Sequence, residues 1–263
     1  EIYGFEDGYK GLIYGNFHML TSKDFSGILT RGGTILGTSR QPFKLMRVPD
    51  KDGLDKVAAM KHTYHKLSLD CLVILGGNGT HKTANLLREE GLNVVTLPKT
   101  IDNDLIHTDH TPGFGSAARY VASTVREITI DANVYEKKSV TIIEIMGRHA
   151  GWLTAASALA RKYTGDNPLL IYLPETAFDQ EEFLKAVENS FEKNCNVIVC
   201  VSEGIHDDKG TFICEYDNSV GTDTFGHKML AGCGKYLENL VRNRLGVKAR
   251  SVELNVSQRA LHP

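Results

Sequence analysis

The sequence LVILGGNGT, which spans residues 72–80, indicates a strand that ends in a glycine-rich turn and leads into a helix. Residues 72–75 form a short, wholly apolar run of the kind that is buried in a parallel sheet. Residues 80–90 continue as a helical pattern that places three apolar side chains on one face, namely Ala84, Leu86 and Leu87. A buried strand followed directly by an amphipathic helix predicts an α/β protein.

The rest of the chain repeats this alternation of strand and helix almost throughout. We expect further strands over residues 93–97, 140–146, 169–173, 196–201 and 249–256, and helices over 152–162, 180–193 and 226–245. This pattern predicts mostly parallel sheets covered by helices on both faces. The loop-rich residues 107–115 are the expected crossing between two lobes. Ligands bind beyond the carboxyl ends of the strands in such sheets, so we expect the site there.

The composition is that of a globular protein, with 41% apolar and 24% charged residues. Thirty basic and 32 acidic residues leave a formal charge of −2, so we expect no nucleic-acid partner. No apolar stretch approaches the roughly 20 residues that cross a bilayer, and we expect no membrane association. Five scattered cysteines without a CxxC pair indicate mostly buried free thiols in a reducing cytoplasm. The chain lacks an initiator Met and a leader, and we expect it to begin partway into a longer protein.

The glycine-rich turn, Gly76 to Thr80, is the first candidate for phosphate binding. Glycines let backbone N–H groups approach an anion closely, and the start of a helix adds partial positive charge. The spacing matches neither the P-loop nor the dinucleotide fingerprint. The alternative is a tight turn in which Thr80 helps to start the helix.

The polar loop KTIDND, residues 99–104, follows the next strand and is the second candidate. One of the carboxylates of Asp102 and Asp104 can accept a hydroxyl proton while the other holds Mg²⁺, as phosphoryl transfer requires. Thr100 could bond a phosphate oxygen, and Lys99 could pair with one. The alternative is a capping turn rich in Asp and Asn.

Charged residues also lie at the ends of other strand-like stretches or around the last predicted strand. Arg is suited to bridging phosphate oxygens through its planar guanidinium group, although a single Arg is more often a solvated surface residue. The charged residues in these places are Arg40, Arg148, Glu203, Arg250 and Arg259. Several cations and one carboxylate at strand ends indicate a site for a phosphorylated, hydroxyl-bearing ligand. The chemistry expected from the residues alone is phosphoryl transfer onto a sugar phosphate.

Two further features have ordinary structural explanations. His62 and His65 form an HxxH pattern, but they lie on a predicted helix without a matching acidic or cysteine cluster. We interpret them as a half-exposed helix face. Trp152 is expected in the core rather than on a stacking platform.

The quoted motifs together resemble the 6-phosphofructokinase family over essentially the whole chain. The matching blocks are GGNGT at 76–80, PKTIDND at 98–104, MGR at 146–148, SEG at 202–204 and QR at 258–259. The resemblance implies two αβα lobes with mostly parallel sheets and the active site in the cleft between them. Residues 1–113 would be the phosphoryl-donor lobe, 114–257 the sugar-phosphate lobe and 258–263 the start of a return to the first lobe. The implied reaction converts fructose 6-phosphate to fructose 1,6-bisphosphate with Mg²⁺, as in glycolysis.

The resemblance also implies roles for individual residues. Asp102 looks like the base that takes the proton of the sugar 1-hydroxyl, with Thr100 and Asp104 beside the transferring phosphate. The residues that resemble the sugar-binding set are Met146, Gly147, Arg148 and Glu203. Arg250 and Arg259 resemble the cations on the 6-phosphate, with Arg250 reaching in from a neighbouring subunit. The donor side is implied to involve Tyr9, Arg40, Gly77, Asn78, Gly79, Thr80 and Lys99, and the metal Asp102, Asp104 and Asn78.

Several positions depart from the family pattern. Asn78 stands where many members have an Asp, Ser139 replaces an Arg with Lys138 beside it as a substitute, and Val256 replaces a substrate His. The glycine-rich loop GGDxPGxN of the first strand is absent. These departures leave open a non-catalytic regulatory homologue that binds sugar phosphates.

The phosphoryl donor is expected to be ATP, with pyrophosphate as the alternative. Pyrophosphate-dependent members typically have an Asp in place of Gly79 and a Lys at position 99, whereas ATP-dependent bacterial members have Gly at both. This chain combines Gly79 with Lys99. Gly79 leaves room for a nucleoside, which an acidic side chain would repel. The resemblance further implies a homo-oligomer, either a dimer or a tetramer, and allosteric regulation.

Overall fold

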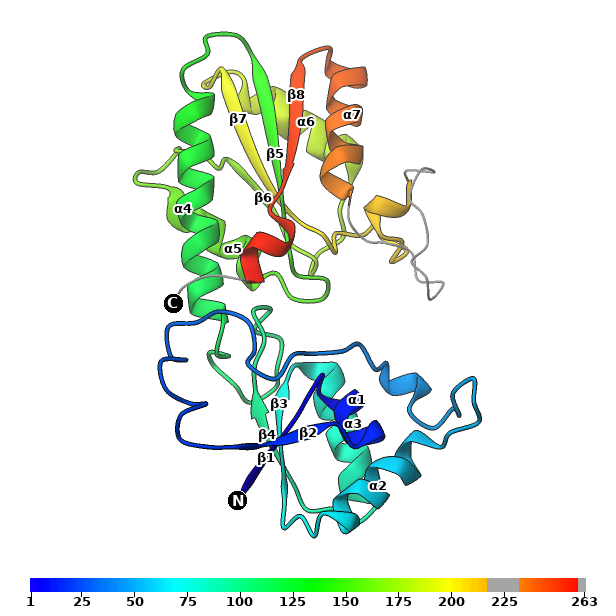
Figure 1. Cartoon of the computed structure of the whole chain (residues 1–263). Coiled ribbons are helices and arrows are strands. Elements are labelled where there is room, and N and C mark those ends of the chain that lie inside the picture. Colours follow the sequence, from blue (N-terminus) through cyan, green and yellow to red (C-terminus); the bar gives the residue numbers. More distant parts are fainter. Residues whose placement is uncertain (217–231, 260–263) are drawn as a thin grey trace. The chain divides into compact units, whose positions relative to one another are not determined.

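The computed structural model describes residues 1–216 and 232–259. Contacts divide the chain into two compact units (Figure 1). Unit 1 comprises residues 1–100 and 104–112, and unit 2 comprises residues 101–103 and the described residues from 113 onward. The functions expected for the two lobes stay predictions.

Unit 1 contains an antiparallel pair of strands and a parallel pair. Its elements are β1 (Ile2–Phe5), α1 (Tyr9–Tyr14), β2 (Phe17–Leu20), η1 (Phe43–Leu45), α2 (Lys56–Lys66), β3 (Leu72–Gly76), α3 (Asn78–Glu89) and β4 (Val94–Pro98). β1 pairs with β2 in antiparallel orientation, and β3 pairs with β4 in parallel orientation. In the parallel pair Gly76 lies opposite Pro98, so the glycine-rich turn and the KTIDND loop leave the sheet side by side.

Unit 2 is built on one four-stranded sheet in which every strand is parallel, in the order β6-β7-β5-β8. Its elements are α4 (Phe114–Ala132), β5 (Ser139–Ile145), α5 (Trp152–Ala156), η2 (Ser157–Ala160), β6 (Leu170–Tyr172), α6 (Gln180–Ser190), β7 (Asn196–Ser202), η3 (Ile213–Tyr216), α7 (Cys233–Leu245), β8 (Lys248–Glu253) and η4 (Asn255–Arg259). The parallel α/β architecture expected from the sequence is confirmed.

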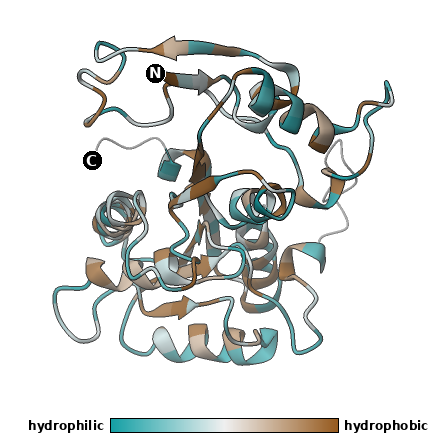
Figure 2. Cartoon of the chain, turned by 90° about the horizontal axis from the view of Figure 1, so that it is seen from below, coloured by the Kyte–Doolittle hydropathy of each residue, from teal (hydrophilic) through white to brown (hydrophobic). Residues whose placement is uncertain are grey.

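Helices cover both faces of the unit 2 sheet. Alternate side chains of a strand point to opposite faces, so Ile142 and Ile143 of β5 enter different cores. Ile142 packs in a cluster with Phe183 of α6 and Leu237 of α7. Ile143 packs in a cluster with residues of α4 and α5. All seven residues of β7 are buried, which explains why residues 197–201 of this strand form an uninterrupted apolar run. Figure 2 shows hydrophobic residues along the strands and mixed faces on the helices.

The parallel pair in unit 1 is covered on one face. Leu72 packs in a cluster with Met60 of α2 and Leu87 of α3. The alternate side chains of β3 and β4 are exposed, with 59% for Val73, 62% for Leu75, 49% for Val95 and 42% for Leu97. Coverage of both faces, as expected for a parallel sheet, is therefore found in unit 2 and not among the described residues of unit 1.

Several expected elements differ from the structure. The 19-residue helix α4 was not expected, although its buried positions Ala117, Val121 and Val125 recur every four residues, as on one face of a helix. The helix expected over 152–162 is split into α5 and the 3₁₀ turn η2. Trp152 is 56% exposed, so its expected place in the core was wrong. The helix expected from residue 226 is α7, which begins at Cys233, and residues 226–231 lie outside the described residues.

Within residues 1–216 and 232–259, the structure holds no helix with the length and hydropathy needed to span a bilayer. The five cysteines are free thiols. Cys200, Cys214 and Cys233 are buried, whereas Cys195 is exposed and Cys71 is half-buried.

Candidate active site

The MGR turn begins where β5 ends, at Ile145. Gly147 adopts a φ of 137°, which favours glycine, and a Cβ there would overlap the carbonyl oxygen of Ala150. The turn leaves the side chain of Arg148 exposed at the carboxyl end of the strand. This is the edge of the sheet where ligands bind in α/β proteins.

The SEG turn follows the neighbouring strand β7 and packs tightly against the MGR turn. Ile145 and Ser202 are partners in the parallel ladder, so the two strands end together. The buried Ser202 hydroxyl donates a hydrogen bond to the Gly147 carbonyl, and the Glu203 N–H donates to the Ile145 carbonyl at 2.9 Å. A Cβ on Gly204 would overlap the backbone of Arg148. Only glycine at position 204 therefore allows the two turns to meet.

The charges at this edge act on the half-buried carboxylate of Glu203. Burial raises the pKa of Glu203 above its ordinary value, and the nearby carboxylate of Asp102 raises this pKa further. A hydrogen bond from the Gly147 N–H and the charges of Arg148 and Arg259 act in the opposite direction. Four residues that were predicted from separate segments are thus brought into one cluster of unit 2. We call Asp102, Arg148, Glu203 and Arg259 the acceptor cluster.

The QR motif is fixed to the same edge by Gln258. This side chain is 1% exposed, and its Oε1 accepts a hydrogen bond from the Met146 N–H at 3.3 Å. Its Nε2 donates to the Asn255 carbonyl at 3.1 Å. The 3₁₀ turn η4 is thereby held against the end of β5, and Arg259 at its last position is exposed. Val256, which departs from the family pattern, is 60% exposed.

The KTIDND loop contributes to both units. Asp102 and the buried Asn103, which has a φ of 54°, belong to unit 2, whereas Thr100 and Asp104 belong to unit 1. The Thr100 carbonyl accepts a hydrogen bond from the Thr111 hydroxyl at 2.7 Å, and Thr111 is 2% exposed. Sequence analysis missed Thr111, which ties the loop 104–112 back to Thr100.

The glycine-rich turn of unit 1 has the form expected of an anion site. A Cβ on Gly76 would lie 2.5 Å from the Thr80 hydroxyl, so the turn requires glycine there. Gly77 precedes α3 and offers no side-chain cap, and a Cβ on Gly79 would meet no atom within 4 Å. Asn78 is exposed in the first turn of the helix. The start of α3 is therefore open enough for a phosphate to bind there, with its oxygens accepting hydrogen bonds from the backbone N–H groups of the first turn.

Tyr9 holds this turn from α1. Its hydroxyl donates to the Thr80 carbonyl at 2.7 Å, and burial raises the pKa of Tyr9 above its usual range. The residues before Arg40 are tied to the start of α1, because the Ser39 hydroxyl donates to the Asp7 carbonyl at 2.6 Å. The structure thus connects the turn, Tyr9 and the segment of the exposed Arg40 within unit 1. The Lys99 N–H bonds the Gly76 carbonyl at 2.9 Å, and its side chain is exposed.

Arg250 lies at the opposite end of the unit 2 sheet. It is paired with Thr141 near the start of β5, and its guanidinium contacts Asp131 at 2.9 Å and the Thr141 hydroxyl at 3.1 Å. A cavity of about 460 Å³ beside it is lined by Val134, Tyr135, Glu136, Lys137, Ser139, Val140, Lys248 and Arg250. Within one chain the structure does not bring Arg250 to the acceptor cluster. Lys138, the expected substitute for the Arg that Ser139 replaces, lies over the Phe191 ring at 5.3 Å.

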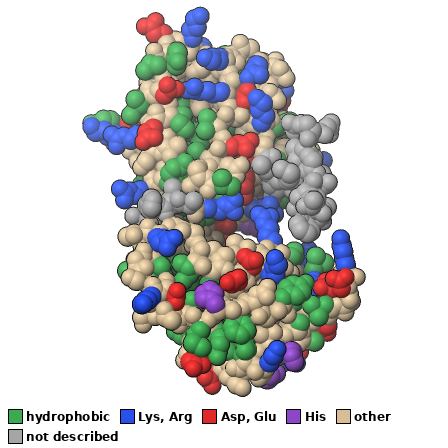
Figure 3. Space-filling view, viewed as in Figure 1, with side chains coloured by type: hydrophobic (Ala, Val, Ile, Leu, Met, Phe, Trp, Pro, Cys, Tyr) green, Lys and Arg blue, Asp and Glu red, His purple; other side chains and the backbone are tan. Residues whose placement is uncertain are grey.

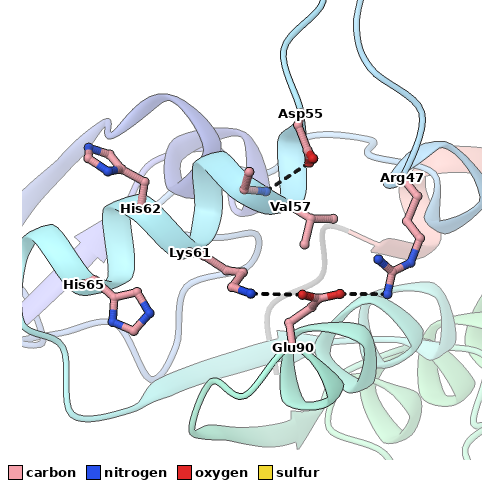
Figure 4. A pocket seen from close by; sticks show the side chains of 8 residues that line it. Arg47, Asp55, Val57, Lys61, His62, His65 and Glu90 are labelled. Atoms are coloured by element: carbon pink, nitrogen blue, oxygen red, sulfur yellow. Dashed lines mark hydrogen bonds and ion pairs between the residues drawn. The ribbon is translucent and has the colours of Figure 1, made fainter.

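A separate pocket of about 580 Å³ in unit 1 contains the HxxH pair (Figure 4). Its charges are compensated internally, because Glu90 bridges Arg47 at 2.9 Å and Lys61 at 3.0 Å. Both histidines, His62 and His65, are exposed on α2, as the sequence interpretation expected. In the part of the chain that the structure describes, no three His, Cys, Asp or Glu side chains form a group that could hold a metal ion.

The comparison with known proteins agrees with the motifs. The family model described as Phosphofructokinase matches residues 1–263. The chain belongs to the phosphofructokinase family.

Individual phosphofructokinases of both donor types are similar to this chain. The ATP-dependent 6-phosphofructokinase of Spirochaeta thermophila is 46% identical over 212 residues, which cover 78% of this chain and 55% of that protein. The pyrophosphate–fructose 6-phosphate 1-phosphotransferase of Amycolatopsis methanolica is 36% identical over 264 residues, which cover 100% of this chain and 72% of that protein. The crystal structure of the pyrophosphate-dependent phosphofructokinase from Nitrosospira multiformis matches with a TM-score of 0.79 and 25% identity, covering 98% of this chain and 61% of that one. The chain thus spans about half to three quarters of the length of these relatives.

Proposed function

We propose that the chain is the part of a phosphofructokinase that transfers a phosphoryl group from ATP to the 1-hydroxyl of fructose 6-phosphate. The acceptor cluster carries this proposal, because it joins a half-buried carboxylate, two cations and Asp102 at the carboxyl end of the unit 2 sheet. Such a set suits a ligand that bears both hydroxyl groups and a phosphate. The five free thiols fit a cytoplasmic enzyme.

The roles of the acceptor cluster follow from its chemistry. Ionised Glu203 accepts hydrogen bonds from sugar hydroxyl groups, while Arg148 and Arg259 supply charge to phosphate oxygens. Asp102 takes the proton of the 1-hydroxyl as its oxygen attacks the terminal phosphorus of the donor. The bond from that phosphorus to the leaving oxygen breaks, and the remaining diphosphate departs.

The two carboxylates of the KTIDND loop suit a magnesium ion. Mg²⁺ is usually held by one or two carboxylates together with substrate phosphates, and Asp102 and Asp104 offer carboxylate oxygens of this kind. When bound, the ion neutralises charge on the phosphates.

The donor is proposed to bind at the start of α3. The open space around Gly79 supports ATP, because it leaves room for a nucleotide larger than pyrophosphate. The exposed Lys99 suits either donor, and the relatives include enzymes named for each. Pyrophosphate is therefore the second candidate donor.

Arg250 is proposed to serve the acceptor phosphate of a neighbouring copy. Its place at the amino end of the sheet supports this, because the acceptor cluster lies at the carboxyl end. The cavity of about 460 Å³ beside it holds two further cations, Lys137 and Lys248. A homo-oligomer would present this surface to the acceptor site of another subunit.

Replacing Asp102 tests the proposed function. In the full-length encoded protein, Asp102→Ser removes the proton acceptor, and turnover with either donor should fall about a hundred- to ten-thousandfold. Fructose 6-phosphate should still bind in isothermal titration calorimetry. Asp208→Ser, which changes an exposed carboxylate of the same unit, should leave both unchanged. A wild-type protein that binds fructose 6-phosphate but turns over neither donor would instead support a regulatory homologue.

A further inference from the structure

Glu144 is a buried acid that the proposed reaction does not use. It lies in β5, two residues before the MGR turn, and is 5% exposed. Burial raises the pKa of Glu144, and the nearby Glu253 raises it further. A carboxylate in such a place is unfavourable unless its oxygens are hydrogen-bonded. Its partners therefore indicate why it is there.

The carboxylate of Glu144 caps the start of α7. Its Oε1 accepts the Gly232 N–H at 3.2 Å and its Oε2 accepts the Gly234 N–H at 2.7 Å. Gly232 precedes the helix and offers no side chain to cap it, so the acceptor comes from the sheet. A Cβ on Gly234 would lie 3.2 Å from Oε2, which shows how closely the helix approaches.

The first turn of α7 in turn contacts the SEG turn. The Cys233 thiol, which is 0% exposed, reaches the Ser202 carbonyl at 3.6 Å. Ser202 precedes Glu203 and bonds the Gly147 carbonyl through its hydroxyl. The pKa of the Cys233 thiol is raised by burial and by the charges of Glu144 and Glu203, so both acids lie near it. Glu144, Met146 and Glu203 also line one small cavity of about 20 Å³.

We infer that Glu144 is a positioning residue for the phosphoryl acceptor, an inference that rests on the proposed function. It holds the first turn of α7 in place, so that Cys233 packs against Ser202. This contact in turn holds Glu203 and Arg148 in position for binding. Glu144 is 5% exposed and bonds the start of α7, so it acts through this turn. Its removal therefore weakens acceptor binding more than it slows the chemical step.

The test compares Glu144→Ala and Glu144→Gln with Val187→Ala in the full-length protein. Val187 is fully buried on α6 in the core beneath α7, so its truncation measures loss of stability alone. Glu144→Ala should raise the KM for fructose 6-phosphate about tenfold or more, with kcat within about threefold. Glu144→Gln retains one acceptor oxygen and should lie between wild type and Glu144→Ala. Val187→Ala should lower the melting temperature and leave KM unchanged.

Hydrogen exchange separates this inference from the proposed function. The amide of Glu203, bonded to Ile145, should exchange at least about tenfold faster in Glu144→Ala than in wild type, and at the wild-type rate in Val187→Ala. Unchanged exchange and KM in the Glu144 variants would overturn the inference, as would an equal rise in KM for Val187→Ala. Faster exchange with unchanged KM would also overturn it, because the contact would then be structural only.

A wild-type protein that fails to bind fructose 6-phosphate refutes the proposed function, and the inference with it; unchanged exchange in Glu144→Ala refutes the inference alone.

Discussion

The two parallel sheets of this chain are built from the same strand–turn–helix unit, yet they differ in how they are covered. In unit 2 the strands β5 and β7 are buried on both faces between two helical layers. In unit 1 the pair β3 and β4 packs on α2 and α3 through one face, while Val73 and Leu75 point to an exposed face. Hydrophobic side chains also gather on the visible surface of unit 1 in Figure 3.

The turns at the ends of these sheets differ in the same way. The MGR and SEG turns of unit 2 touch through backbone atoms, and Gly147 and Gly204 have no room for a side chain. The glycine-rich turn of unit 1 is locked at Gly76 but open at Gly79. Packing therefore fixes the backbone of the proposed acceptor site. In the proposed donor site, an open position such as Gly79 can accept different side chains. This agrees with relatives that are named for the same acceptor but for different donors.

The difference in burial predicts the largest effect. Ile142→Ala in β5 should destabilise the protein by about 2–5 kcal/mol, because it leaves a cavity in a core packed on all sides. Leu75→Ala in β3 should change the free energy of unfolding of these 263 residues by no more than about 0.5 kcal/mol. Urea denaturation of both variants measures the two values. Equal losses would show that the two sheets are equally covered.

The difference between the turns predicts a smaller effect. Gly204→Ala forces a Cβ into the backbone of Arg148, which should cost about 1–3 kcal/mol and weaken fructose 6-phosphate binding. Gly79→Ala has space for its methyl group and should be neutral, or stabilising by up to about 1 kcal/mol. Thermal melts and calorimetric titration with fructose 6-phosphate distinguish them. Tolerance of Gly204→Ala with unchanged binding would refute the locked turn.

The raised pKa of Glu203 predicts a modest pH effect on the acceptor side. Because burial raises this pKa above 4.5, the carboxylate is protonated at a higher pH than an exposed glutamate. Affinity for fructose 6-phosphate should therefore fall on acidification through that raised pKa. Glu203→Gln should bind fructose 6-phosphate more weakly at neutral pH. The pH dependence of its affinity should then reflect only the titration of the ligand's own phosphate. Titrations at several pH values measure both curves, and parallel curves would exclude Glu203 as the titrating group.

Much of the fold was predictable because apolar runs such as residues 197–201 occur in strands that are buried on both faces. The acceptor cluster was predictable in part for a related reason. The carboxyl ends of parallel strands meet at one edge, so Arg148 and Glu203 were expected to be neighbours. Helix α4 was missed although Ala117, Val121 and Val125 recur every four residues along it and so carry the helical pattern.

Other parts of the site depend on contacts that spacing alone does not encode. Arg250 was grouped with Arg259 by nearness to one strand, but it lies at that strand's beginning, where Asp131 pairs with it. Glu144 and Ser202 stand inside apolar strands, and their roles emerge only once the start of α7 is located. Thr111 is distant from Thr100 in sequence and is joined to it by the fold of the loop.

Parallel assays of the full-length encoded protein with fructose 6-phosphate, using ATP in one and pyrophosphate in the other, test the central claim most directly. The acceptor cluster and the open Gly79 predict formation of fructose 1,6-bisphosphate, with a higher kcat/KM for ATP. Faster turnover with pyrophosphate would retain the acceptor site and correct the donor. Absence of product with both donors would contradict the account.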